Sequence, residues 1–174
     1  HIIVLTTDVQ RERVMYLHEA GADNVITKPV AARTIIEKFA ATLTPQSSLG
    51  KDVDQARRLC DSQQYAEALA ACESILAVKP GHPRVSLIMG DAYRGLKDYD
   101  KARQAYETAY ESSELYLAPL QHLADMYGEL GETEQQIHYL QKLDELSPLN
   151  INRKVFLGEM HLSRGDIDKA AAMF

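Results

Sequence analysis

The sequence predicts an α-helical solenoid of antiparallel helix pairs, preceded by a short α/β segment. Two observations predict this fold. Residues after about 49 repeat a pattern every 34 positions, and residues before 44 alternate between short apolar runs and amphipathic stretches. A fixed period of this size is typical of stacked helical repeats, whereas alternating strand and helix signals are typical of an open α/β sheet. We therefore expect two different kinds of structure in one chain.

Strand and helix signals alternate in the first 43 residues. The apolar run at residues 2–5 is rich in β-branched side chains and predicts a strand buried on both faces of a parallel sheet. Residues 9–20 predict a helix with a polar outer face, and Gly21 follows as its stop. Residues 24–27 predict a second strand, and residues 32–43 predict a second amphipathic helix. The expected order is β-α-β-α.

These residues carry a resemblance. IIVLTT, GADNVITKPV and TIIEKF are similar to the last two strand-helix units of a bacterial response-regulator receiver domain, which is a flavodoxin-like fold. The resemblance implies that Thr6 senses a phosphoryl group, that Lys28 neutralises it, and that the peptide bond before Pro29 is cis. A hydroxyl and an ammonium at the carboxyl ends of neighbouring strands can both contact an acyl phosphate. The alternative is that Thr6 only ends a strand and that Lys28 is solvated.

The match covers the second half of a receiver domain. In the family, the aspartate that accepts the phosphoryl group and the acidic pair that holds Mg²⁺ lie in the first half, so we expect no cofactor here and Mg²⁺ only in an intact receiver domain. The resemblance is incomplete at Val25, where the family often has an aromatic residue. Two strands without the other three leave an open apolar edge, which should either pair with another copy or remain poorly ordered. Of the two we expect self-association, for example as a homodimer.

A linker is predicted at residues 44–52, because TPQSSLGKD holds Pro, Ser and Gly between two periodic segments. Residues 53–174 resemble tetratricopeptide (TPR) repeats, whose period is 34. The repeats start near Leu49, Pro83, Leu117 and Ile151, and the last one is incomplete. The resemblance implies a right-handed superhelix. The eighth position of each repeat is always small, because two antiparallel helices approach closely there: Ala56, Gly90, Ala124 and Gly158.

In TPR proteins the first helix of each repeat lines an inner groove that binds a protein or peptide. The residues expected to line it are Val53, Arg57, Arg84, Leu87, Asp91, Arg94, Gln121, Asp125, Val155 and Glu159. Three carboxylates, Asp91, Asp125 and Glu159, occupy the ninth position of successive repeats. This row suits a peptide that carries basic residues, or it is simply a solvated face. The combined set of asparagines and basic residues with which chaperone-type TPR proteins hold a terminal carboxylate is absent, so a chaperone tail is not an expected ligand.

The composition of the chain limits the classes of partner and the cellular location that we expect. The net charge is -6, with no long Lys/Arg run, so nucleic acid is not an expected partner. Two cysteines and no long apolar span predict a cytoplasmic protein with reduced thiols and no membrane segment. The chain opens at His1 inside a predicted strand and closes at Phe174 without a stop signal, so we expect it to be cut from something longer.

The leading functional prediction is a two-component signalling adaptor, in which a receiver domain, phosphorylated by an upstream histidine kinase, regulates a TPR binding groove. The alternative is a constitutive scaffold whose receiver remnant only dimerises or caps the solenoid. An enzyme is not expected, because the sequence has no nucleophile-base pair, phosphate-binding loop or set of metal ligands. We assign no catalytic residue and no metal site.

Overall fold

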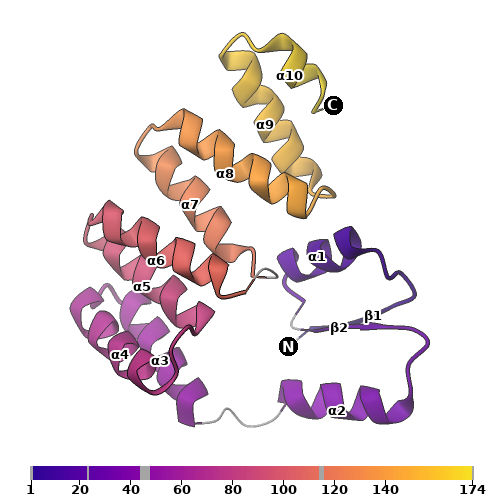
Figure 1. The fold of residues 1–174 in the computed structure, drawn as a ribbon, viewed down its shortest axis with the longest axis vertical. Coiled ribbons are helices and arrows are strands. Elements are labelled where there is room, and N and C mark those ends of the chain that lie inside the picture. The colour runs from indigo at the N-terminus through magenta and orange to yellow at the C-terminus, as the bar shows by residue number, and fades with distance from the viewer. Residues whose placement is uncertain (1, 23, 44–47, 114–115, 174) are drawn as a thin grey trace. The chain divides into compact units, whose positions relative to one another are not determined.

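The computed structural model describes residues 2–22, 24–43, 48–113 and 116–173, and it is mostly helical (Figure 1). Contacts divide the chain into two compact units. One unit contains residues 1–45 together with residues 140–174, and the other contains residues 46–139. The elements follow the predicted order, with a small α/β segment before a series of helices.

A two-stranded parallel sheet forms the centre of the α/β segment. Strands β1 (Ile3–Thr6) and β2 (Asn24–Thr27) pair so that Thr6 lies opposite Thr27. The helices α1 (Arg11–Glu19) and α2 (Ala32–Leu43) lie on opposite sides of the strands (Figure 1). The expected β-α-β-α order is therefore present. The described residues form only this short sheet, so a receiver domain is not shown.

The expectation that the first strand is buried on both faces is wrong. Ile2 and Leu5 expose 56% and 47% of their surface, whereas Ile26 on β2 is buried. A strand is fully covered only when it has neighbours on both edges and helices over both faces. Among the described residues, β1 pairs with β2 alone, so its apolar side chains remain partly in water.

In the described part of the chain, eight helices follow the α/β segment as four consecutive pairs. The second helices of the pairs begin at Tyr65, Tyr99, Thr133 and Ile167, which are 34 residues apart, the same spacing as the predicted repeat. The expected linker at residues 44–52 is wrong in its second half, because α3 begins at Ser48, and residues 44–47 lie outside the described part of the chain. The helices are α3 (Ser48–Asp61), α4 (Tyr65–Val78), α5 (Pro83–Gly95), α6 (Tyr99–Glu111), α7 (Ala118–Glu129), α8 (Thr133–Leu146), α9 (Ile151–Ser163) and α10 (Ile167–Ala171).

Close approach between paired helices explains the small eighth position. A Cβ atom on Gly90 would lie 2.3 Å from Cε1 of Tyr106, whose ring is fully buried against α5. Ala56 and Ala124, at the same position in their repeats, are fully buried too. The core of the first repeats in unit 46–139 is a cluster of small and medium apolar side chains, namely Val53, Ala56, Cys60, Ala68, Cys72, Ile75, Val85, Ile88 and Ala92.

The turn inside each helix pair has one repeated backbone conformation. The residue with positive φ recurs every 34 positions, as Gln63 at 62°, Lys97 at 62°, Gly131 at 73° and Gly165 at 78°. At each turn, the next backbone N–H donates back to a carbonyl five residues earlier, as Asp98 does to Tyr93. This is the left-handed C-terminal cap that ends many helices. The turn geometry is thus kept in all four repeats, although the residue type changes.

Within the part of the chain that the structure describes, no helix is long and apolar enough to cross a membrane.

Candidate functional site

A cavity of about 400 Å³ opens on the first helices of three successive repeats. Its walls come from α3, α5 and α7, together with Tyr65 at the start of α4. The position agrees with the groove expected from the sequence. The lining residues are Arg57, Cys60, Asp61, Tyr65, Asp91, Arg94, Gly95 and Glu129.

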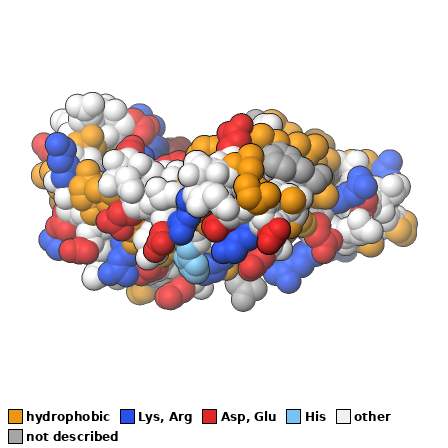
Figure 2. Space-filling view, turned by 90° about the horizontal axis from the view of Figure 1, so that it is seen from above, with side chains coloured by type: hydrophobic (Ala, Val, Ile, Leu, Met, Phe, Trp, Pro, Cys, Tyr) orange, Lys and Arg blue, Asp and Glu red, His pale blue; other side chains and the backbone are white. Residues whose placement is uncertain are grey.

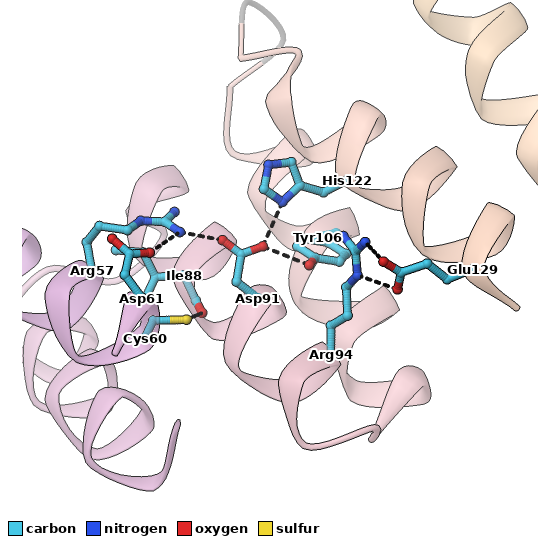
Figure 3. Close-up of polar contacts among 9 residues, drawn as sticks. All are labelled: Arg57, Cys60, Asp61, Ile88, Asp91, Arg94, Tyr106, His122 and Glu129. Carbon is cyan, nitrogen blue, oxygen red and sulfur yellow. Dashed lines mark hydrogen bonds and ion pairs between the residues drawn. The ribbon is translucent and has the colours of Figure 1, made fainter. Parts of the chain in front are cut away.

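Asp91 is the centre of a hydrogen-bond network at this cavity (Figure 3). Arg57 Nη1 donates to Asp91 Oδ2 at 2.6 Å, and Tyr106 Oη donates to Asp91 Oδ1 at 2.8 Å. Nδ1 of His122 lies 2.6 Å from the same Oδ1. The carboxylate therefore connects side chains from α3, α5, α6 and α7, and its side chain is only 15% exposed.

Electrostatics keep this carboxylate ionised. Burial alone would raise the pKa of Asp91, but the hydrogen bonds from His122, Arg57 and Tyr106 outweigh burial and hold the pKa below its usual value. Burial and the neighbouring Asp91 charge raise the pKa of Tyr106, so its hydroxyl stays protonated and remains a donor. The network is thus satisfied internally near neutral pH.

A second ion pair crosses from one repeat to the next. Arg94 binds Glu129 through two parallel contacts, with Nε donating to Oε2 at 3.0 Å and Nη2 donating to Oε1. The hydrogen bond from Arg94 lowers the pKa of the Glu129 carboxyl group. The same bond to Glu129 raises the pKa of the Arg94 guanidinium. The Glu129 side chain is 55% exposed, so this carboxylate still meets solvent.

The structure brings three of the predicted groove residues together, namely Arg57, Asp91 and Arg94. Gln121 and Asp125 are exposed on α7, where Gln121 Nε2 donates to Asp125 Oδ1 at 2.8 Å. Arg84 forms an ion pair with Asp54 at 3.4 Å outside the cavity lining.

Two other groove expectations come out differently. Val53 and Leu87 are 1% and 4% exposed, so they belong to the core and do not face a groove. Their helices turn these positions toward the neighbouring helices. Val155 and Glu159 lie on α9 in the other compact unit and are exposed there, and their place in a groove stays a prediction.

Within the expected row of carboxylates, Asp91 forms an ion pair with Arg57 from the preceding repeat. The exposed acidic groups of the cavity are Asp61 and Glu129, which were not predicted. Tyr106 and His122 were missed as well. A signal was available for the ion pair, since Arg57 and Asp91 stand 34 residues apart at the same repeat position.

In the α/β segment, Thr6 and Lys28 lie at the carboxyl ends of the two paired strands. The Lys28 backbone N–H donates to the Thr6 carbonyl at 2.7 Å, and the Thr6 hydroxyl accepts from the Asp8 N–H at 3.0 Å. The peptide bond between Lys28 and Pro29 is cis, as the resemblance implied. Phosphoryl sensing by Thr6 and Lys28 stays a prediction.

Family models identify the repeats. Two models of the tetratricopeptide repeat match residues 59–113 and 118–148, and these residues are therefore TPR repeats. Neither match includes residues 1–43, so the receiver domain that the resemblance implied is not shown. No curated protein matches the chain.

Solved structures share the helical solenoid fold. A crystal structure of MamA superposes with a TM-score of 0.61 at 17% identity, covering 79% of this chain and 80% of that one. MamA 41-end from Desulfovibrio magneticus RS-1 gives 0.56 at 20% identity, covering 94% and 88%. YrrB, described as a TPR protein with an unusual peptide-binding site, gives 0.57 at 18% identity, covering 79% and 70%. At these identities the likeness concerns the fold alone.

Proposed function

We propose that this chain is a constitutive protein-interaction scaffold that holds a peptide segment in the cavity on α3, α5 and α7. The observation that carries the proposal is that one cavity is lined by the first helices of three successive repeats. An extended segment crossing these helices can contact each repeat in turn, because the same face recurs along a solenoid. YrrB, which shares the fold, is a TPR protein with a peptide-binding site, and this supports the same use of the fold here.

The chemistry of the cavity rim favours a ligand that carries Lys or Arg. The Asp61 and Glu129 side chains are 63% and 55% exposed, whereas those of Arg57 and Arg94 are 33% and 23% exposed. An incoming cation therefore meets carboxylates first. Figure 2 shows acidic and basic side chains interspersed on the face that it draws. The expected preference for a basic ligand therefore rests on the exposed carboxylates of Asp61 and Glu129 alone.

A selection experiment tests the proposal. A displayed library of random peptides is panned against the chain, and the selected peptides are measured against an Asp61→Asn/Glu129→Gln double variant by calorimetry. We expect peptides enriched in Lys and Arg, with affinity falling about tenfold in the double variant because two charge-assisted contacts are lost. The matched control is Glu67→Gln on the exposed surface of α4. Peptides that bind all three proteins equally would show that the cavity is not the binding site.

A second candidate is the adaptor in which a receiver domain controls the repeats. It is favoured by the positions of Thr6 and Lys28 at the carboxyl ends of two parallel strands. A complete receiver domain would supply the aspartate and the Mg²⁺ site, and a histidine kinase would be the upstream partner. Incubation of the parent protein with acetyl phosphate and Mg²⁺ tests this candidate. An acid-labile, hydroxylamine-sensitive phosphoryl group that changes peptide affinity would support it, and no incorporation would leave the constitutive scaffold.

A further inference from the structure

A second polar cluster belongs to the other compact unit, where α1 meets the turn between α8 and α9. Three side-chain donors, two from this turn and one from the first turn of α9, converge on the Glu19 carboxylate. Ser147 Oγ donates to Oε2 at 2.6 Å, while Asn150 Nδ2 and Arg153 Nη1 donate to Oε1 at 2.7 and 2.5 Å. All four residues belong to the same compact unit. We call Ser147, Asn150 and Arg153 the carboxylate cradle.

The cradle is organised by bonds within the turn itself. The Arg153 backbone N–H donates to Asn150 Oδ1 at 3.2 Å, which fixes the Asn150 amide at the start of α9. Arg153 Nη2 donates to the Ser147 carbonyl, which fixes the guanidinium against the turn. Ser147 is fully buried and the Arg153 side chain is 3% exposed. The orientation of the donors is therefore fixed by bonds among Ser147, Asn150 and Arg153, and α1 contributes only the carboxylate that they bind.

The charges of the turn require an anion at this place. Among the described residues, the cationic groups beside Asp144 are Lys154, whose Nζ lies 2.7 Å from Oδ2, and Arg153, whose Nε lies 3.7 Å from Oδ1. The Arg153 Nε and Asp144 Oδ1 atoms are buried and make no hydrogen bond. One carboxylate thus faces two cations, and without Glu19 the turn carries an excess positive charge on a buried guanidinium. A buried cation left without its partner is strongly unfavourable.

The geometry fits a carboxylate better than other anions or neutral groups. Both oxygens of one planar group are engaged, one by a hydroxyl and the other by an amide and a guanidinium. A side-chain amide in the same place would turn one N–H₂ group toward these donors and lose at least one bond. A guanidinium donor adds directional preference for a carboxylate oxygen.

We propose that the turn between α8 and α9 is a recognition site for a glutamate side chain of a partner segment, and that Glu19 fills it in cis. Glu19 is the last residue of α1 and its side chain is 19% exposed, so it can leave the cradle without moving a core side chain. A partner that presents a glutamate at a helix end replaces Glu19 and frees α1. This site does not depend on the proposed peptide cavity, which lies in the other compact unit.

The test uses the intact chain with Glu19→Ala, which empties the cradle, and the matched control Glu12→Ala, which removes an exposed glutamate from the first turn of α1. The probe is the acetylated and amidated decapeptide RERVMYLHEA, which copies residues 11–20. Calorimetry should give binding to Glu19→Ala at least about tenfold tighter than to the wild type or to Glu12→Ala, because only the first protein lacks the competing carboxylate. A peptide with Gln in place of its second glutamate should lose about tenfold in affinity for Glu19→Ala.

Two further measurements test which group the site recognises and whether Ser147 contributes to binding. The Gln peptide is also made with a free carboxyl terminus in place of the amide, to test whether the site binds a terminal carboxylate instead of a glutamate side chain. If the free terminus restores binding, the assignment to glutamate is overturned. Ser147→Ala in the Glu19→Ala background should weaken the decapeptide severalfold while far-UV circular dichroism stays unchanged. The proposal is overturned if the folded Glu19→Ala protein does not bind the decapeptide, or if it binds the glutamate and Gln peptides equally. Glu129→Gln, which changes the proposed peptide cavity, should leave these affinities unchanged. The test of the glutamate site is therefore independent of whether the cavity proposal holds.

Discussion

Arg57 and Asp91 occupy the same position in successive repeats and form an ion pair of 2.6 Å. The pair joins α3 to α5 in the lining of the cavity, and Tyr106 and His122 bind the other oxygen of the same carboxylate. A single aspartate therefore satisfies donors from three other helices. Its role is to hold neighbouring repeats together at the place where the proposed ligand binds.

Replacing Asp91 by Asn should destabilise the chain by about 2 kcal/mol, because charge-assisted hydrogen bonds are lost and Arg57 keeps its charge without a partner. The free energy of unfolding is measured by urea titration. The matched variant Asp125→Asn changes an exposed aspartate at the same position of the next repeat, and it should stay within about 0.5 kcal/mol of the wild type. Equal effects of the two substitutions would contradict the central role of Asp91.

The stabilisation by Asp91 should depend on pH in one direction. Because the folded pKa of Asp91 is below its usual value, the unfolded chain binds its proton first as the pH falls. The contribution is therefore complete above the unfolded pKa of about 3.9 and is lost as the pH falls through the folded pKa. The difference in unfolding free energy between the wild type and Asp91→Asn should shrink below about pH 4 and stay constant between about pH 5 and 7. A difference that grows toward low pH would have the wrong sign.

Gly90→Ala tests the close approach of α5 and α6. The new methyl group would lie 2.3 Å from the Tyr106 ring, which is fully buried, so one of the two helices must shift. We expect a loss of about 1–3 kcal/mol in unfolding free energy, typical of overpacked cores. In a Tyr106→Leu background the same substitution should cost clearly less, because the ring is gone. Equal costs in the two backgrounds would mean that the contact does not limit the packing.

The sequence predicts the repeats well because many weak signals recur at one spacing. A period of 34 predicts both the small residues, such as Gly90, and the start of each second helix. If one repeat departs from the pattern, the same position in the other three repeats still indicates the structure. The α/β segment has no such redundancy. Its elements were placed correctly, but the burial of β1 depends on neighbouring strands, and Leu5 is accordingly more exposed than a central strand allows.

The candidate site was predicted less completely than the fold, for a physical reason. Helix periodicity tells which side chains share a face, but ion pairs between helices depend on how far one repeat is rotated against the next. Arg57, Asp91 and Arg94, which periodicity put on one face, line the same cavity, while the pairing that neutralises Asp91 was not foreseen. The link from Glu19 to Arg153 spans 134 positions and has no periodic signal at all.

Substitutions at equivalent turn positions of two repeats should change the stability in opposite directions. Lys97 has φ of 62° and Gly131, its counterpart in the next repeat, has φ of 73°. Side chains disfavour this left-handed conformation by roughly 1 kcal/mol. Lys97→Gly should therefore be neutral or stabilise the chain by up to about 1 kcal/mol, whereas Gly131→Ala should destabilise it by about 1 kcal/mol. Thermal and urea unfolding measure both. A loss of stability in Lys97→Gly similar to that in Gly131→Ala would show that the lysine side chain, and not the backbone, sets the turn.

The two cysteines should react slowly in the folded chain. Burial, with a contribution from Asp91, raises the pKa of Cys60 to about 11, and burial raises that of Cys72 to about 12. At pH 8 the thiolate of Cys60 is then roughly one part in a thousand, compared with about a quarter for an unfolded cysteine. Rates with a disulfide reagent are measured on Cys60→Ser and Cys72→Ser, each of which keeps one thiol.

Cys60 should be the faster of the two, because it lines the cavity and is 6% exposed, whereas Cys72 is fully buried. Its rate should rise with pH toward about 11, and a bound peptide should slow it while leaving Cys72 unchanged. In 8 M urea both thiols should react at the same fast rate, which is the control for intrinsic reactivity. Fast labelling of Cys72 in the native chain would mean that the α3–α4 pair opens often, and the packing of the first repeat would then be weaker than the buried core indicates.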